Sequence, residues 1–278
     1  MNLVLNNHKI CKTELPQSMD TLTSNNPMHV HLADHMLLID AETVISGPTR
    51  RPTYVLIWST TDRTFSFSTA SGKILFEGKA ALVAPDVERQ LKTVDSNIFS
   101  LNIEPGHAAY HSLSQLTYNH GLCPLKIDQL KEFSIELRRH LKDENNKKIE
   151  ETIQHIMSPL LPKHAQFRQR DERIDRLLPL LDHPAPPELS SLAQMLHLSK
   201  DQLSHLFSAE IGMPIRSYIL WRRYRRAILA LQSGEKLSTV AQQVGFYDQA
   251  QMSRTFQNLF GFSPSTLKQP EFIHISGI

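Results

Sequence analysis

The chain has 278 residues, 40% of them hydrophobic, and its 30 Lys or Arg residues nearly balance 28 Asp or Glu residues. This length predicts two domains with cores of ordinary size, and the net charge of +2 does not by itself point to nucleic acid. The sequence has two cysteines, Cys11 and Cys123, no run of about 18 apolar residues and no basic N-terminal segment followed by an apolar one. It therefore argues against a disulfide-stapled secreted protein and a membrane protein, and we expect a cytoplasmic location.

Residues 28 to about 104 have the pattern of short strands. Apolar runs rich in β-branched and aromatic side chains alternate with turn signals such as Gly47-Pro48 and Pro105-Gly106. The expected strands are His35–Ile39, Tyr54–Trp58, Phe65–Phe67, Ile74–Phe76, Ala80–Val83 and Ile98–Ile103. Many short strands at this spacing are typical of an antiparallel sandwich or barrel.

From about residue 126 the pattern changes to that of helices. Two amphipathic stripes at three- and four-residue spacing comprise first Leu130, Phe133, Leu137 and Leu141, and then Ile149, Ile153, Ile156 and Met157. Pro159 and Pro162 end the second stripe, and another helix is expected over Asp171–Leu181. We therefore assign residues 1–158 to an N-terminal domain, with strands over about 28–110 and helices over about 124–158, and residues 159–170 to a linker.

The C-terminal part contains an internal repeat. The stretch Leu189–Ile211 recurs in altered form as Leu237–Phe260, with Ala193 matching Ala241 where two helices would cross. Each copy is typical of two short helices joined by a tight turn. We therefore expect an all-α domain over residues 171–270 that contains two helix–turn–helix units. Two such units in tandem suit a periodic target, and DNA is the obvious one.

The second unit has the features of a DNA-reading device. Gly245 ends its first helix, and Asp248 stands where an N-cap residue accepts backbone N–H bonds. The next helix has a polar side that suits base edges, because arginine is bidentate to guanine and glutamine to adenine. This side holds Gln249, Gln251, Ser253, Arg254 and Gln257.

The first unit repeats this design with a less basic surface. Ser199 can cap its second helix, whose exposed side holds Lys200, Asp201, Gln202, Ser204, His205 and Ser208. Asp201 would repel phosphate, or could accept a hydrogen bond from cytosine. The helix between the units, Ile215–Leu231, carries an arginine cluster, in which Arg222, Arg225 and Arg226 are predicted to contact phosphates.

The C-terminal domain resembles the DNA-binding domain of the AraC/XylS transcriptional regulators. The resemblance covers residues of about 171–270 and rests on the motif Ala241-x-x-Val244-Gly245-Phe246-x-Asp248-Gln249-x-x-x-Ser253-Arg254-x-Phe256-x-x-x-Phe260-Gly261-x-Ser263-Pro264. It implies two helix–turn–helix units on adjacent segments of the major groove. The base-facing residues that it implies are Asp201, Ser204 and His205 in the first unit, and Gln249, Ala250, Gln251, Ser253 and Arg254 in the second. The family usually has a basic residue where this chain has Gln257.

The same resemblance implies an N-terminal sensing domain of the cupin-like β-barrel type, followed by dimerisation helices, and thus an α+β multidomain fold. No specific motif carries this part. Candidate residues for an effector pocket are His31, Tyr54, Trp58 and Phe67, although the aromatic ones also suit a core. His29 and His31 alternate on a strand and could share a metal, but the His/Glu set of a metal-binding cupin is incomplete. We therefore expect no metal, no cofactor and no catalytic residue.

Together these features predict a sequence-specific DNA-binding transcriptional regulator that is controlled by a small-molecule effector and is not an enzyme. The expected partners are double-stranded promoter or operator DNA, a second copy of the chain and RNA polymerase, as for an activator, with no membrane partner. Two alternatives stay open. One is a DNA-binding regulator without a small-molecule ligand, and the other is a cupin-type metalloenzyme.

Overall fold

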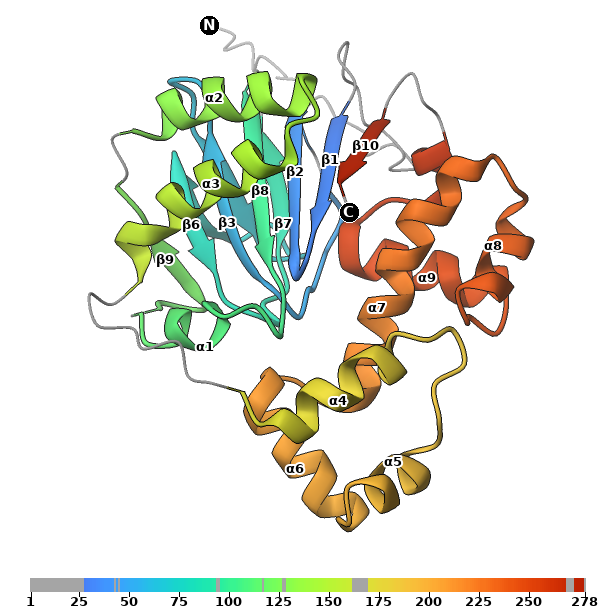
Figure 1. Ribbon diagram of the computed structural model, residues 1–278. Coiled ribbons are helices and arrows are strands. Elements are labelled where there is room, and N and C mark those ends of the chain that lie inside the picture. Colours follow the sequence, from blue (N-terminus) through green and yellow to red (C-terminus); the bar gives the residue numbers. More distant parts are fainter. Residues whose placement is uncertain are drawn as a thin grey trace, which may run out of the picture.

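The computed structural model describes residues 28–42, 44, 46–93, 96–116, 118–126, 129–161, 170–268 and 273–277. Most of the expected linker, the first 27 residues and Cys11 lie outside this described part. The chain has a β-rich N-terminal region and a helical C-terminal region (Figure 1). In the described segments, no helix is long and apolar enough to cross a membrane.

Two sheets form the N-terminal region. Within the described residues the large sheet has seven strands, in the order β10 (Ile273–Gly277), β1 (Met28–Ala33), β2 (Met36–Glu42), β8 (Asn97–Ile103), β3 (Tyr54–Ser59), β6 (Ala80–Val83) and β9 (Leu122–Pro124). The small sheet has the order β5 (Ile74–Gly78), β4 (Phe65–Ser68) and β7 (Gln90–Thr93). All six expected strands are present as β2, β3, β4, β5, β6 and β8, and the expected set did not include β1, β7, β9 or β10.

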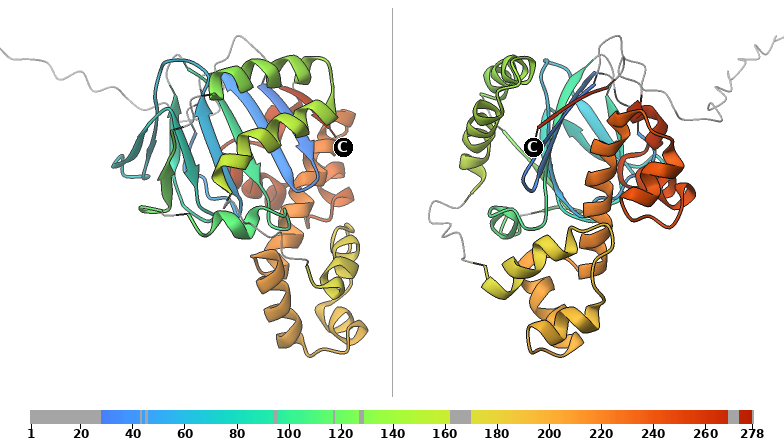
Figure 2. Two further views of the ribbon diagram at one scale, coloured as in Figure 1. Left: turned by 60° about the vertical axis from the view of Figure 1, so that its left-hand side comes forward. Right: turned by 45° about the vertical axis from the view of Figure 1, so that its right-hand side comes forward.

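The expected β-barrel is wrong, because the large sheet is open. Its edge strands, β10 and β9, are not hydrogen-bonded neighbours. One face of the sheet packs against helices, and the other packs against the small sheet and the helical region (Figure 2). A sheet closes or stacks to bury apolar surface, and here these layers bury it without closure.

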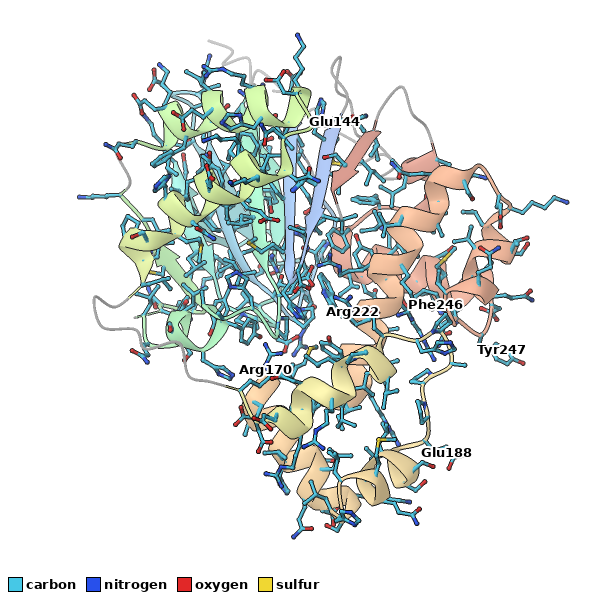
Figure 3. The ribbon with its side chains drawn as sticks, viewed as in Figure 1. Glu144, Arg170, Glu188, Arg222, Phe246 and Tyr247 are labelled. Atoms are coloured by element: carbon cyan, nitrogen blue, oxygen red, sulfur yellow. The ribbon has the colours of Figure 1, made fainter. Side chains whose placement is uncertain are left out.

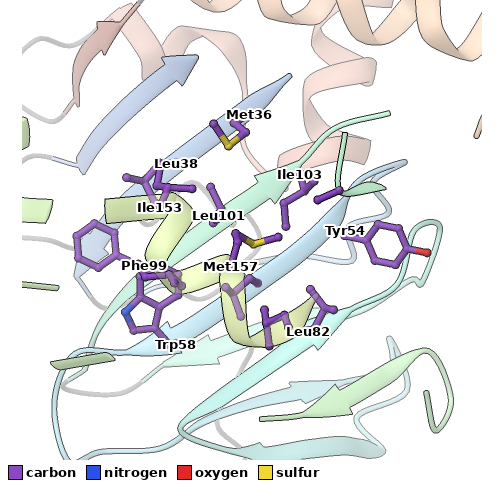
Figure 4. Packing of buried hydrophobic residues seen from close by; sticks show 14 of the residues in the cluster. Met36, Leu38, Tyr54, Trp58, Leu82, Phe99, Leu101, Ile103, Ile153 and Met157 are labelled. Atoms are coloured by element: carbon purple, nitrogen blue, oxygen red, sulfur yellow. The ribbon is translucent and has the colours of Figure 1, made fainter. Parts of the chain in front are cut away.

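The helices α2 (Leu130–Lys142) and α3 (Asn146–Met157) cover one face of the large sheet, as their two apolar stripes predict. Alternation along β3 turns Tyr54, Leu56 and Trp58 towards them (Figure 4). The indole Nε1 of Trp58 donates to Ser134 Oγ on α2 at 2.9 Å. The apolar stripe of α2 is therefore buried against the large sheet of its own chain. The 3₁₀ turn η1 (Ser158–Leu160) follows α3, and the short helix α1 (Tyr110–Leu113) precedes both.

The helical region contains both expected helix–turn–helix units. The elements are α4 (Glu172–Leu181), α5 (Leu189–Met195), α6 (Lys200–Ile211), α7 (Ile215–Ala230), η2 (Leu231–Ser233), α8 (Leu237–Gln243), α9 (Gln249–Phe260) and η3 (Pro264–Lys268). Ser199 forms a capping box with Gln202 at the start of α6, and Asp248 Oδ1 accepts from the backbone N–H of Gln251 at the start of α9. Gly245 has the left-handed φ of +92° that the turn after α8 requires.

The two regions share one hydrophobic core. Val30, Leu32, Leu37 and Ile39 project from the face of β1 and β2 opposite α2 into the same buried cluster as residues of α7, α8 and α9. The main contributors from the helices are Trp221, Tyr224, Val240, Met252, Phe256 and Phe260. The second helix–turn–helix unit thus packs directly on the sheet, whereas the first unit lies below it around α4 to α6 (Figure 1).

Candidate nucleic-acid interface and interdomain cavity

The second reading helix, α9, presents most of its predicted contact residues. Gln249, Ala250 and Arg254 are exposed, and Gln251 and Ser253 are half-buried. The side chain of Gln251 is already engaged at the helix start, because its Oε1 accepts from the backbone N–H of Tyr247 at 2.9 Å. Arg254 has no hydrogen-bonding or ionic partner among the described residues and is free to reach an external acceptor.

Tyr247 is a surface residue that the sequence interpretation did not single out. It lies in the turn just before α9, and 88% of it is exposed (Figure 3). A large exposed aromatic ring with a phenolic hydroxyl can both pack and donate. Tyr247 directly follows Phe246, which is buried, and the sequence carried no further signal that would have singled it out.

The first reading helix, α6, is exposed in the same manner. Lys200, Asp201 and His205 are exposed, and Ser204 is half-buried. The hydroxyl of Ser204 donates to the backbone oxygen of Lys200 at 2.8 Å, so it has a partner within the helix. Each reading helix therefore offers a polar surface with one cation among the predicted contacts, Lys200 on α6 and Arg254 on α9.

The predicted phosphate-binding arginines are placed differently from expectation, and for Arg225 the prediction is wrong. Its side chain is only 4% exposed and donates to Glu104 Oε1 at 2.6 Å and to the Ala33 carbonyl oxygen at 2.6 Å. A guanidinium held in this way inside the protein cannot reach a DNA phosphate. Its closeness in the sequence to Arg222 and Arg226 put Arg225 in the cluster, but α7 packs with this side chain buried.

Arg222 and Arg226 also have partners inside the protein. Both donate to the carboxylate of Asp182 at the end of α4, and Arg226 also donates to the carbonyl oxygen of Val244 at 3.2 Å. These bonds join α4, α7 and α8, so the two arginines connect the two helix–turn–helix units. Phosphate contact by Arg222 or Arg226 would compete with this role.

Glu104 and Arg225 form a buried ion pair between the two regions. Glu104, just after β8, is completely buried, and its Oε2 has no hydrogen-bond partner among the described atoms. Arg225 also donates to the Met36 carbonyl oxygen at 3.3 Å. Buried charges of this kind are retained only when they are paired. We call the pair the Glu104–Arg225 clasp.

A small cavity lies between the large sheet, the small sheet and the end of α9. Its volume is about 60 Å³, and its lining includes Phe67, Ile57 and Met28 from the sheets and Phe260 and Phe262 from the helical region. None of the described residues in its lining is acidic. A space of this size holds a few water molecules or a small chemical group.

Two arginines, Arg51 and Arg89, line this cavity, and no carboxylate of the described lining is available to pair with them. Arg89 is buried, and its Nη1 donates to the Val87 carbonyl oxygen at 3.0 Å. Arg51 donates to the Leu259 carbonyl oxygen at 2.7 Å, and its guanidinium lies 4.2 Å from the centre of the Phe260 ring. Burial lowers the pKa of Arg89 to about 9, with the nearby charge of Arg51 as a second cause, and lowers that of Arg51 to about 10. No carboxylate among the described lining residues offsets either positive charge.

The four predicted effector-pocket residues do not come together. Phe67 lines the cavity, but Tyr54 and Trp58 lie on the opposite face of the sheet in the core under α2 and α3. His31 is buried on β1 beside β10, where its Nδ1 lies 3.1 Å from Ser276 Oγ. The alternation of side chains along the strands places Tyr54 and Trp58 on the face of the sheet away from the cavity. Arg51 and Arg89 were not predicted as lining residues, because both stand next to other charged or polar residues in the sequence. The described residues contain no cluster of three or more His, Cys, Asp or Glu side chains that could hold a metal.

Acidification is expected to destabilise the protein through the buried His31 and the partly buried His35. Burial lowers the pKa of His31 and of His35 to about 4, from 6.5. The unfolded chain therefore binds more protons between pH 6.5 and pH 4, so stability is full above pH 6.5 and falls as the pH drops, by at most about 1.4 kcal/mol per pH unit for each histidine.

Melting temperatures at pH 7.5 and pH 5.0 measure this effect. His31→Gln should reduce the loss on acidification, whereas His155→Gln, at an exposed position on α3, should not. An equal loss in wild type and His31→Gln would show that His31 does not cause it.

The comparisons with known proteins agree on the helical region. Residues 192–269 match the family model of a helix-turn-helix domain. The arabinose operon regulatory proteins of Salmonella typhimurium and Escherichia coli are each 37% identical to this chain over 82 residues, which is 29% of this chain and 29% and 28% of those proteins. The chain thus spans less than a third of the length of these relatives. An uncharacterized HTH-type transcriptional regulator of Haemophilus influenzae is 24% identical over 191 residues, 64% of each protein.

A solved structure resembles both regions together. ToxT from Vibrio cholerae superimposes with a TM-score of 0.52 at 15% identity, covering 84% of this chain and 96% of that chain. A structure of the same protein with an unsaturated fatty acid bound gives a TM-score of 0.51 at 14% identity, covering 83% of this chain and 92% of that chain. The C-terminal region of this chain therefore contains a helix-turn-helix domain similar to that of the arabinose operon regulatory proteins, and the chain has the two-region fold of ToxT.

Proposed function

We propose that the chain is a transcriptional regulator that binds promoter or operator DNA through α6 and α9. The observation that carries this proposal is the pair of capped reading helices, each with an exposed polar surface, at the two ends of one connecting helix. With 16 residues, α7 is about 24 Å long, which suits units that enter adjacent major-groove segments about 34 Å apart. Residues 171–270 would bind DNA, and residues 1–158 would sense a signal.

The predicted base contacts keep their assignment under this proposal, with two refinements. Lys200, Asp201, His205, Gln249, Ala250 and Arg254 offer exposed atoms to the groove. Gln251 and Ser204 keep only part of their hydrogen-bonding capacity for DNA: the Nε2 of Gln251 can still donate and the hydroxyl oxygen of Ser204 can still accept while both keep their present partners. A DNA-protection experiment with the purified chain tests the proposal, which predicts two protected major-groove segments about one helical turn apart. A single protected segment, or none, would contradict it.

We propose further that the signal is a small anionic amphiphile bound in the interdomain cavity. Arg51 and Arg89 supply two cations without a carboxylate from the cavity walls, and the remaining lining is largely apolar. Phe260 and Phe262 belong to the DNA-binding region, so an occupant would contact both regions. The bound fatty acid in ToxT is of this chemical class. The apolar tail needs more room than about 60 Å³, so binding would displace side chains in the shared core.

Palmitoleic acid, its methyl ester and the matching alcohol test the effector proposal. The acid should raise the melting temperature of the full chain, because a ligand that binds only the folded state stabilises it, by about 2.7 kcal/mol at 100 times Kd. The neutral ester and alcohol should have much smaller effects. Arg89→Gln should abolish the response, whereas Arg50→Gln, at an exposed neighbouring position, should keep it. Equal shifts with acid and ester, or an unchanged response in Arg89→Gln, would contradict an anion site and favour a regulator without this ligand.

The remaining partners follow from the proposed function. A second copy of the chain and RNA polymerase are proposed partners, and a DNA-binding regulator would act in the cytoplasm. The apolar stripe of α2 is buried on the sheet, so a dimer contact by this helix would use its outer side, where Ile135 is 56% exposed. The relatives are regulators, and no enzymatic role is proposed.

A further inference from the structure

The C-terminal strand β10 returns from the helical region to the N-terminal sheet. It pairs with β1 in parallel, in a register from Met28↔Ile273 to Leu32↔Gly277. The other strand pairs of both sheets in the described chain are antiparallel. A parallel pair needs a crossover connection, and here the crossover contains the whole DNA-binding region. The two strands lie side by side in Figure 1.

Both faces of β10 contact neighbouring parts of the chain. Ile273 and Ile275 are buried in the core that the sheet shares with α7 and α9. On the opposite face, the ring of His274 lies 5.3 Å from that of His29, and Ser276 Oγ lies 3.1 Å from His31 Nδ1. The strand is also tied to the helical region itself, because Gln232 Nε2 donates to the Ile275 carbonyl oxygen at 3.2 Å. It therefore connects the edge of the sheet to the end of α7.

The last residue of this strand fits its neighbour only as glycine. Gly277 has a φ of +102°, and a Cβ atom added to it would lie 1.9 Å from the carbonyl oxygen of Leu32. Because the clash is with backbone atoms, a side chain at this position must displace the strand. The edge of β1 thus accepts a strand with apolar residues at alternate positions and glycine at the fifth.

We propose that β10 is a releasable latch, in which the C-terminal tail binds the edge of β1 and holds the second helix–turn–helix unit against the sheet. Burial of two isoleucines favours docking, and the ordering of five residues opposes it by a free energy of the same order. Such a balance lets a modest perturbation release the strand. Met28 and Ile39, which line the interdomain cavity, belong to β1 and to its neighbour β2, so the latch adjoins the proposed effector site.

Hydrogen exchange on the full chain without DNA tests the latch. In wild type, the amides of β1 that face β10 should be protected. Gly277→Ala should increase their exchange at least tenfold and also increase exchange in α7 and α9, because the second unit loses one of its attachments. Gly72→Ala is the matched control, since Gly72 has a similar φ of +84° but no atom within 4 Å of an added Cβ. It should leave exchange in β1, α7 and α9 unchanged.

A synthetic peptide with the sequence of residues 270–278, added to the Gly277→Ala chain, should restore protection in β1, and the same peptide with Ile275→Asp should not. Unprotected β1 amides in wild type would show that the strand is not docked in solution. A change confined to β1 and the tail would show that β10 covers an edge without holding the second unit. Neither result depends on DNA binding, so failure of the latch and failure of the proposed function are distinguishable.

Discussion

Arg254→Ala is expected to weaken operator binding roughly 5- to 150-fold, because a bidentate arginine–guanine contact is worth about 1–3 kcal/mol. Arg254 is exposed on α9 and has no partner among the described residues, so its removal should not disturb the fold. A fluorescence-anisotropy titration with operator DNA at fixed salt concentration measures the effect, since affinity for DNA depends strongly on salt.

The control for this prediction is Arg63→Ala, which removes the same charge from an exposed site in the N-terminal region. Arg63→Ala should bind operator as wild type does, and both variants should keep the wild-type melting temperature. Operator titrations that coincide for Arg254→Ala and wild type would refute the assignment. A uniform loss on specific and random DNA would instead identify Arg254 as a phosphate contact, because phosphate contacts carry no sequence information.

Arg225→Met is expected to lower the free energy of unfolding by about 3–5 kcal/mol, because it leaves the buried Glu104 carboxylate without its cation. Replacing both members of the clasp, with Arg225→Met and Glu104→Leu together, should recover much of this loss, since no unpaired charge then remains buried. Urea unfolding measures both effects. Arg216→Met, at an exposed position of the same helix, is the control and should change stability by less than about 0.5 kcal/mol.

The two tryptophans of the chain allow a sharper form of this experiment. Trp58 lies in the core under α2 and α3, and Trp221 lies in the core that the sheet shares with the helical region. Variants that keep only one of them, made with Trp58→Phe or Trp221→Phe, report on each region separately. With the clasp intact the two unfolding transitions should coincide, and with Arg225→Met they should separate. Separate transitions in wild type would mean that the clasp does not couple the regions.

Local chemistry made much of the helical region predictable. Ser199, Gly245 and Asp248 act on backbone groups within a few residues of themselves, so their roles as caps and turn residues follow from their positions in the sequence. The alternation of apolar residues likewise located strands such as β3 and β8. The motif around Arg254 indicated the family because it combines such local requirements in one segment.

Contacts between distant segments decided the rest. Arg225 looks like a member of a solvent-exposed cluster until Glu104, 121 residues away, is placed against it. Tyr54 and Phe67 are both aromatic strand residues, and the alternation along β3 together with the stacking of two sheets places Tyr54 in the core under α2 and α3 and Phe67 beside the cavity. Strand β10 has no partner within its own segment. The sequence alone therefore determined the main helices of the helical region, their caps and the exposed polar sides of α6 and α9, because these depend on neighbours a few residues apart. The tertiary structure alone decided which charges are buried, where a ligand could lie and how the sheet ends, because these depend on segments that meet only when the chain has folded.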